Sequence, residues 1–165
     1  MRPENKIIRR DDLPDVRMRH KEIALCSGCF DILQPGHAVF FQQCKDAAET
    51  LVVVVGRDAS IARQKPSRPL NPENNRLYLV AALADVDYTI LGEEEMKPGK
   101  IDYYHIAQDL RPDVLILNDD DSGLVEKRAF CERLGIRLVT VERVVPDLLT
   151  PTSTSEIIAK AKAVP

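Results

Sequence analysis

Short, almost uninterrupted apolar runs recur along the chain and alternate with longer segments of helical spacing. The runs are rich in β-branched residues and lie at residues 23–28, 51–56, 88–92, 114–118 and 137–141. Continuous apolar runs of this length are typical of strands covered on both faces. Their alternation with helices predicts a parallel sheet with right-handed crossovers. We therefore expect a Rossmann-like α/β fold: a doubly wound, five-stranded parallel sheet with helices on both faces.

Two of the intervening segments carry local helix signals. Asn71-Pro72-Glu73 combines a capping residue, a first-turn proline and an early carboxylate, and an apolar face follows through residues 77–84. Residues 124–134 repeat apolar positions at helical spacing, and Gly135 suits the position just after a helix. We expect both helices to pack on the sheet.

Length and charge narrow the class of protein. The 165 residues suffice for one domain with its own core, so we assign residues 1–165 to a single domain with residues 1–20 as an N-terminal extension. The net charge of -3 gives no overall basic field, which argues against a nucleic-acid partner. The charged N-terminus has no signal-peptide-like stretch, and no run approaches the ~20 apolar residues of a membrane span. We expect a cytoplasmic protein that does not bind membranes.

Cys26 and Cys29 form a C-x-x-C pair, a spacing found in redox motifs and in halves of zinc sites. No second close pair or nearby histidine completes a tetrahedral site, and Cys26 lies within a strand-like run. We interpret these cysteines as small buried hydrophobes and predict no metal ion held by the protein itself.

Polar segments follow several of the predicted strands. They comprise residues 28–37, 57–65 and 118–121, and residues 152–155 lie beyond the fifth strand. Ligands of a doubly wound sheet bind beyond the carboxyl ends of its strands. The sequence therefore predicts that these four loops meet at one site.

His37 is the first candidate for chemistry. If a helix begins at Pro35 or Gly36, His37 lies in its first turn, where free backbone N–H groups and the helix dipole favour phosphate. Gly36 would let a phosphate approach the backbone. The alternative is that His37 only caps or packs at a helix start. The Phe-Asp pair at residues 30–31 and the preceding Gly28 favour a functional role.

The Phe-Asp pair itself has two interpretations for each residue. A structural role for Asp31, bonding backbone N–H groups in a turn, is favoured over direct metal binding. Phe30 is equally consistent with the core and with a position beside the ligand.

Four cations gather after the second strand: Arg57, Arg63, Lys65 and Arg68. Such a loop is usually just solvated. Because this loop would overlook the same edge as His37, we predict that Lys65 and Arg63 bind triphosphate oxygens. Arg76 lies inside a predicted helix and is a weaker candidate, with a surface side chain or an ion-pair partner as alternatives.

Hydroxyl and acidic clusters complete the candidate site. Ser153 and Glu156 have capping-box spacing, which is a purely structural interpretation, yet residues 152–155 also offer hydroxyls and N–H groups suited to phosphate. We favour phosphate binding. The acidic run at residues 119–121 has three possible roles: binding magnesium, binding a ribose or base, or forming an acidic surface loop.

Taken together, these segments resemble the cytidylyltransferase-like family of nucleotidyltransferases from about residue 5 to residue 160. The stretches that carry the resemblance are GCFDILQPGH, GRDAS followed by Lys65, SRPLNPENNR, RPDVLILNDD and TSTSEII. The chain is most similar to the heptose-phosphate adenylyltransferases, and the acidic residues 119–120 are similar to those of the glycerol-phosphate cytidylyltransferases.

The resemblance implies an enzyme that transfers AMP or CMP from ATP or CTP to a sugar phosphate or polyol phosphate. It implies that the acceptor phosphate attacks the α-phosphorus, that pyrophosphate leaves, and that Mg²⁺ bridges phosphate oxygens. Positioning and charge stabilisation dominate such transfers. The resemblance also implies a homodimer.

Residue roles follow from the resemblance by motif position. The catalytic residues would be His37, Lys65 and Gln34. The residues that would bind the nucleotide are Gly28, Cys29, Phe30, Asp31, Gly36, Arg63, Asn118, Asp120, Ser153, Thr154 and Ser155. Those that would bind the acceptor are Arg76, Lys97 and Lys100.

Three positions depart from the family pattern. Gln34 replaces a histidine, and an amide that cannot carry charge is expected to cost ~3 kcal/mol of transition-state stabilisation. Leu148 replaces an arginine of the glycerol-phosphate relatives, with Arg143 as a candidate to reach inward. Leu117 replaces a lysine of the heptose relatives. The rival hypothesis is therefore a catalytically weakened, nucleotide-binding regulatory module.

Overall fold

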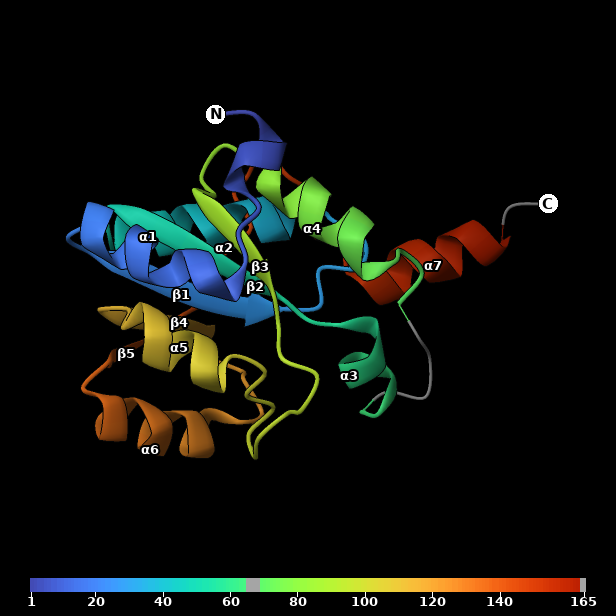
Figure 1. Ribbon diagram of the computed structural model, residues 1–165. Coiled ribbons are helices and arrows are strands. Elements are labelled where there is room, and N and C mark those ends of the chain that lie inside the picture. The colour runs from blue at the N-terminus through green and yellow to red at the C-terminus, as the bar shows by residue number, and fades with distance from the viewer. Residues whose placement is uncertain (65–68, 164–165) are drawn as a thin grey trace.

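The computed structural model describes residues 1–64 and 69–163 and has a five-stranded parallel sheet at its centre. The sheet has the strand order β3-β2-β1-β4-β5 (Figure 1). The strands are β1 (Ile23–Gly28), β2 (Thr50–Val55), β3 (Tyr88–Leu91), β4 (Val114–Asn118) and β5 (Arg137–Val141). Their ends lie within one residue of the predicted ones. The predicted doubly wound parallel sheet is confirmed.

Helices cover both faces of the sheet. On one face lie α1 (Leu13–Arg19), α5 (Tyr104–Leu110) and α6 (Leu124–Leu134), and on the other lie α2 (Pro35–Asp46) and α4 (Glu73–Ala81). The short α3 (Asp58–Ala62) and the last helix, α7 (Thr154–Ala163), lie towards the end to which the strand arrows point (Figure 1). The two predicted helices correspond to α4 and α6, and Gly135 ends α6 in the left-handed conformation, as its position predicted.

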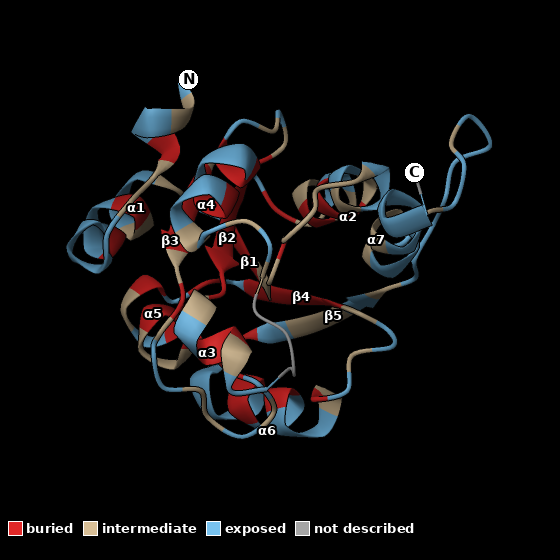
Figure 2. Ribbon diagram, turned by 90° about the vertical axis from the view of Figure 1, so that its right-hand side faces the viewer, coloured by how far each residue is buried: buried red, intermediate tan, exposed pale blue. Residues whose placement is uncertain are grey.

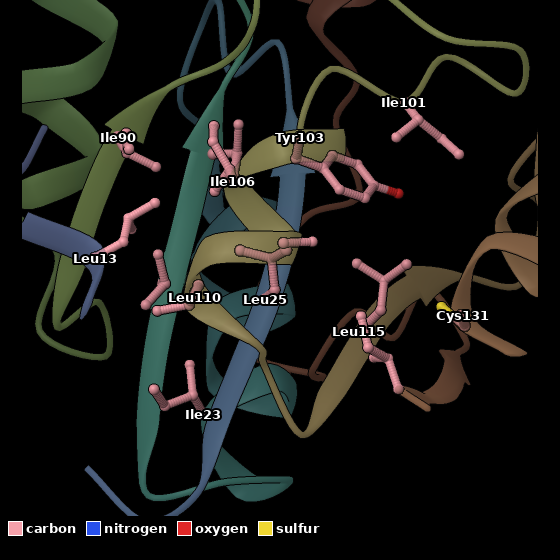
Figure 3. Packing of buried hydrophobic residues seen from close by; sticks show 14 of the residues in the cluster. Leu13, Ile23, Leu25, Ile90, Ile101, Tyr103, Ile106, Leu110, Leu115 and Cys131 are labelled. Atoms are coloured by element: carbon pink, nitrogen blue, oxygen red, sulfur yellow. The ribbon is translucent and has the colours of Figure 1, made fainter. Parts of the chain in front are cut away.

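The alternation of side chains along each strand divides the core into two clusters. Ile23 and Leu25 of β1 pack towards α1, α5 and α6, where they meet Ile106 and Leu110 (Figure 3). Ala24 and Cys26 of the same strand pack towards α2 and α4. Figure 2 shows buried residues along the strands and the inward faces of the helices. Because β1 is covered on both sides, its carboxyl end is a firm base for the loop that follows.

The first twenty residues pack as part of this domain. They include two short 3₁₀ helices, η1 (Pro3–Lys6) and η2 (Arg10–Asp12), and α1. Leu13 and Val16 are buried in the core, and the Lys6 ammonium donates to the Val86 carbonyl at 2.6 Å. This segment is thus integral to the fold, because it supplies core side chains and covers the edge of β3, where Ile8 N–H donates to Thr89 O at 2.9 Å.

The strand order reverses at β1, which has β2 on one side and β4 on the other. The chain therefore leaves the carboxyl ends of these central strands in opposite directions, and this geometry opens a crevice between the loops. No helix in the two described ranges is long and apolar enough to cross a bilayer.

Candidate functional site

A cleft of about 770 Å³ lies beyond the carboxyl ends of β1 and β4. Its walls come from the end of β1 and the following turn, from the first turns of α2, from Asn118, and from the segment that joins β5 to α7. All four predicted loops therefore contribute residues to this cleft. The loop after β2 contributes Ile61 among the residues that the structure describes. This volume is typical of small-molecule sites.

The β1–α2 turn is shaped by Phe30. This residue has a φ of 49°, its side chain is buried, and its ring contacts those of His37 and Phe41 at centroid distances of 5.6 and 5.1 Å. A Cβ at Gly28 would come within 2.6 Å of the Phe30 ring, so this position requires glycine. Phe30 also lines the cleft. The core interpretation of Phe30 is therefore confirmed, and its place in the cleft wall is compatible with the predicted position beside the ligand.

Asp31 fixes the other end of this turn. Its carboxylate accepts hydrogen bonds from Leu70 N–H at 3.0 Å and Asn71 N–H at 2.8 Å, and the Asn71 side chain donates to Asp31 O at 2.7 Å. The predicted structural role is confirmed, although the N–H groups come from a distant loop. Within the described ranges, no three His, Cys, Asp or Glu residues gather as a metal site.

Arg76 anchors the β1–α2 turn from the protein interior. Its side chain is completely buried, and its nitrogens donate to the carbonyls of Asn71, Cys29 and Gly56 and to the Asp58 carboxylate. A side chain enclosed in this way cannot reach a substrate. The prediction that Arg76 binds the acceptor is therefore wrong, and so is the surface alternative, whereas the ion-pair alternative is confirmed.

His37 lies in the first turn of α2, which begins at Pro35 as predicted. Its Nδ1 accepts a hydrogen bond from the Gln34 backbone N–H at 3.2 Å. The backbone N–H of His37 donates to Gln34 O at 2.9 Å. Burial, and secondarily the charge of Arg143, lower the pKa of His37 below its ordinary value of 6.5. The neutral tautomer that fits this geometry carries its proton on Nε2. At neutral pH the imidazole is thus a hydrogen-bond donor without a charge.

Gln34 is the residue before α2, and it also lines the cleft. Its side chain lies over Gly36, since a Cβ built on Gly36 would be 3.5 Å from Gln34 Oε1. The Gln34 amide and the His37 imidazole therefore flank the same helix start. Backbone N–H groups at such a start lack intrahelical partners and attract anions.

The start of α7 forms the facing wall. The Ser153 backbone N–H donates to Glu156 at 2.6 Å, and the Glu156 N–H donates to Ser153 Oγ at 3.2 Å. The predicted capping box is confirmed. The Ser153 hydroxyl still has its own proton to donate, and Thr154 and Ser155 also line the cleft.

The match to known proteins agrees with this arrangement. Residues 25–160 match the family described as cytidylyltransferase-like. The chain belongs to this family of nucleotidyltransferases. Its histidine-bearing turn, its hydroxyl cluster and all of its sheet except the first two residues of β1 lie inside the matched segment.

Individual relatives place the chain within the cytidylyltransferase-like family. The Bifunctional protein HldE of Syntrophotalea carbinolica is 34% identical over 163 residues, which cover 95% of this chain and 31% of HldE. The FAD synthase of Aciduliprofundum boonei is 34% identical over 120 residues, or 71% of this chain and 74% of that protein. The chain thus spans about a third of the length of this HldE relative and most of the FAD synthase.

Solved structures show the same fold. The lipopolysaccharide core biosynthesis protein from Thermoplasma volcanium GSS1 is 32% identical, with a TM-score of 0.65 over 75% of this chain and 98% of that one. A pantoate-beta-alanine ligase from Francisella tularensis is 13% identical, with a TM-score of 0.61, and shares the fold alone.

The acidic loop after β4 forms ion pairs at Asp120 and Asp121. Asn118 lines the cleft, but Asp120 does not, because its carboxylate is held by Arg143 at 2.9 and 3.1 Å. Asp121 accepts from Lys127 Nζ at 2.7 Å and from Gly123 N–H at 2.8 Å. In this structure Asp120 forms an ion pair with a residue of the cleft wall, and direct nucleotide binding by Asp120 stays a prediction.

Three predicted cations lie outside the cleft of this cytidylyltransferase-like domain. Arg63 donates to the Glu94 carbonyl at 3.1 Å, Lys97 pairs with Glu95 at 3.6 Å, and Lys100 donates to Ser122 Oγ at 2.9 Å. In this structure each of these side chains is engaged at another part of the surface, and their contacts with nucleotide and acceptor stay predictions. Lys65 lies outside the described residues.

Two features of the site carried weak sequence signals. Arg143 lines the cleft, in agreement with its prediction as a candidate to reach inward where Leu148 replaces an arginine. Asp102 is buried beneath the cleft and accepts a hydrogen bond from Ser27 Oγ at 2.7 Å, and burial raises its pKa to about 6. No motif marked Asp102. Cys26 is buried beside Cys44 in the core, in agreement with its interpretation as a small hydrophobe.

Proposed function

We propose that this protein transfers the AMP moiety of ATP to the phosphate group of a sugar phosphate or polyol phosphate and releases pyrophosphate. The observation that carries the proposal is one cleft with two helix starts in its walls, one bearing His37 and the other bearing the hydroxyl cluster at residues 153–155. Membership of the cytidylyltransferase-like family supports nucleotidyl transfer. Similarity to FAD synthases favours AMP over CMP, since FAD joins AMP to a flavin phosphate.

The reaction is an in-line displacement at the α-phosphorus. A phosphate oxygen of the acceptor forms a bond to this phosphorus, and the bond from phosphorus to the oxygen that bridges to the β-phosphate breaks. The electron pair of the broken bond leaves with pyrophosphate. Negative charge grows on the phosphoryl oxygens, so donors fixed in advance contribute most of the catalysis.

His37 is placed to supply such a donor. Its Nδ1 is occupied by the Gln34 N–H, which fixes the ring and leaves the Nε2 proton for a phosphoryl oxygen. Because burial lowers the pKa of His37, the ring is neutral before the nucleotide binds. The developing charge then strengthens its hydrogen bond in the transition state, which is where added strength raises the rate.

The start of α7 suits the outgoing pyrophosphate. Ser153 presents a hydroxyl proton, and the first backbone N–H groups of α7 lack intrahelical partners. The carboxylates in the cleft wall, Asp31 and Glu156, already accept backbone hydrogen bonds. Magnesium would therefore arrive as the nucleotide complex, held by phosphate oxygens. Lys65 is proposed, by motif position, to neutralise charge on the same phosphates.

Gln34 favours a second candidate, a nucleotide-binding regulatory module with weakened catalysis. An amide at this position donates a hydrogen bond but carries no charge. Loss of one fixed charged donor is expected to slow transfer by about a hundredfold. Nucleotide affinity would persist, since the hydroxyl groups of residues 153–155 and the anion-attracting starts of both helices remain.

The decisive experiment measures pyrophosphate release with ATP, CTP, GTP and UTP, each combined with sugar phosphates, polyol phosphates and FMN in the presence of magnesium. Turnover with ATP and a sugar or polyol phosphate supports the proposal. Turnover with CTP alone, or with FMN alone, overturns the stated donor or acceptor. If no pair reacts, calorimetry with each nucleotide and the variant Gln34→His separate the candidates. Nucleotide binding without rescue supports the regulatory module.

A further inference from the structure

The described part of the cleft is poor in positive charge. Its wall contains two carboxylates, Asp31 and Glu156, and one neutral histidine, His37. Arg143 is the one permanently charged cation among the described residues of this wall. A nucleoside triphosphate carries several negative charges, and helix starts supply only partial positive charges. Within the described wall, Arg143 is therefore the residue that can set a full positive charge against the phosphates.

Arg143 is also well positioned. It follows β5 by two residues, and the segment that bears it is tied to α2, where the Gln43 side chain donates to Glu142 O at 3.2 Å. Its charge reaches the histidine of the opposite wall, because it lowers the pKa of His37. Arg143 thus lies within electrostatic reach of the place where the phosphates must react.

Asp120 holds Arg143 through two hydrogen bonds, from Nε at 2.9 Å and from Nη2 at 3.1 Å. This is the forked geometry with which a guanidinium also binds phosphate. The Arg143 side chain is 67% exposed and the Asp120 side chain 58%. An ion pair so open to water contributes little stability, so a phosphate can compete for the same guanidinium at low cost.

We propose that Arg143 binds the phosphate chain of the nucleotide. In the empty cleft the Asp120 carboxylate holds the Arg143 guanidinium, and the phosphates displace this carboxylate when the nucleotide binds. This inference rests on the proposed function and adds a residue to it. It assigns Asp120 an indirect role: the carboxylate keeps the fork oriented in the empty cleft and competes with the ligand. Arg143 is thus a binding residue, whose loss affects affinity more than the chemical step.

The test is calorimetric binding of inorganic pyrophosphate and of ATP with magnesium to four variants, beside turnover assays. Arg143→Met is expected to weaken binding of both ligands by about tenfold to a hundredfold, the range for a charge-assisted pair. Arg143→Lys should lose part of this affinity, because an ammonium lacks the fork. Asp120→Asn should tighten binding by about twofold to fivefold, since the competing charge is removed.

The matched control is Arg137→Met, which removes the same charge from an exposed position at the start of β5, outside the cleft wall. It should leave both affinities unchanged. Unfolding temperatures of all variants show whether they fold, and exposure of the Arg143 side chain predicts that they do. If Arg137→Met and Arg143→Met weaken binding equally, the loss of affinity comes from the net charge of the protein and not from a contact of Arg143, and the proposal is overturned.

Failure of this inference and failure of the proposed function differ in outcome. If the wild-type protein turns over while Arg143→Met keeps its KM and its pyrophosphate affinity, Arg143 has no binding role and the proposed function stands. If the wild-type protein neither transfers nor binds any nucleotide, the proposed function fails. In that case, pyrophosphate binding that is weakened by Arg143→Met would still support the phosphate site at Arg143. Pyrophosphate binding that is unchanged in Arg143→Met, or no pyrophosphate binding at all, would overturn this site.

Discussion

The two walls of the cleft are built in opposite ways. The β1–α2 wall is packed and heavily hydrogen-bonded: Phe30 is in the core, Asp31 binds two backbone N–H groups, and Arg76 beneath it is fully buried. The β5–α7 wall is open, with residues 142–148 all exposed and α7 without a single buried residue. Under the proposed function, chemistry that needs fixed geometry would take place at the first wall, and the second would adapt to the ligand.

The difference has a physical cause in the order of the strands. β1 is central in the sheet and is covered on both faces, so a residue at its carboxyl end inherits a rigid base. β5 is an edge strand with one neighbour, and its last residues are half-buried at most. Five measurements test this contrast, from the largest expected effect to the smallest.

Arg76→Met should cause the largest loss, because it removes the anchor of the packed wall. The substitution leaves the carbonyls of Cys29 and Gly56 and the carboxylate of Asp58 without their shared partner. Breaking a buried pair on one side costs about 3–5 kcal/mol of unfolding free energy. Urea unfolding measures the loss. Arg143→Met is the control from the open wall and should change the unfolding free energy by less than about 1 kcal/mol. Equal losses would remove the contrast between the walls.

His37→Ala should lower kcat by about a hundredfold to a thousandfold, as expected for a lost donor that acts on the transition state. The fold should persist, since the helix start keeps Pro35 and its backbone bonds. Pyrophosphate release gives the rate, and circular dichroism checks the fold. His20→Ala is the control: His20 bonds Tyr88 Oη at 3.0 Å and is not part of the cleft wall. A kcat unchanged in His37→Ala would exclude His37 from the mechanism.

Asp102 makes the packed wall sensitive to pH. Burial raises its pKa from 3.8 to about 6, so between these values the folded protein binds a proton that the unfolded chain releases. The contribution of Asp102 to the unfolding free energy is therefore fully present below about pH 4. It falls by about 3 kcal/mol as the pH rises to about 6.

The measurement is urea unfolding of the wild type and of Asp102→Asn from pH 4 to pH 7. The variant keeps an oxygen for the Ser27 hydroxyl but cannot titrate. The difference in unfolding free energy between the two proteins should therefore change with pH over this interval and level off above it. A constant difference would show that the pKa of Asp102 is not raised.

How far the sequence predicts this molecule depends on the same contrast. The strands were predictable within a residue, because continuous apolar runs leave few alternatives, and the α7 cap followed from the spacing of Ser153 and Glu156. Arg76 was misplaced because a buried arginine and a surface arginine look alike in a helix. Its partners are carbonyls contributed by three separate loops. Side-chain destinations set by distant backbone groups are invisible to local patterns.

The positions of the cations were also hard to predict from the sequence. Lys97 and Lys100 follow β3, whose loop runs towards α6, where Lys100 meets Ser122. Arg143 carried no motif and yet lines the cleft. Only the strand order, with β4 beside β1 and β5 beside β4, decides which loops share an edge with His37.

Ser153→Ala tests the open wall through its cap. Loss of a capping side chain costs about 1 kcal/mol, and because α7 has no buried residue the cost should remain local. Amide hydrogen exchange is expected to speed up about fivefold at Glu156, whose N–H the Ser153 hydroxyl accepts at 3.2 Å. Ser155→Ala removes a hydroxyl that is not part of the capping box, and it should leave exchange at Glu156 unchanged. A global fall in stability in Ser153→Ala would mean that α7 is an integral part of the core.

The smallest effect is the most direct measure of how the two walls communicate. Burial is the main cause of the low pKa of His37, and the charge of Arg143 across the cleft is the second. Arg143→Met should therefore raise the pKa of His37, while burial keeps it below 6.5. A proton NMR titration resolves this shift, with His20 and His105 in the same molecule as internal references. If the pKa of His37 does not move, Arg143 lies too far from the imidazole in solution to act on the same phosphates. If it rises, the exposed arginine and the half-buried histidine share one electrostatic site, and the open wall contributes charge to chemistry that the packed wall positions.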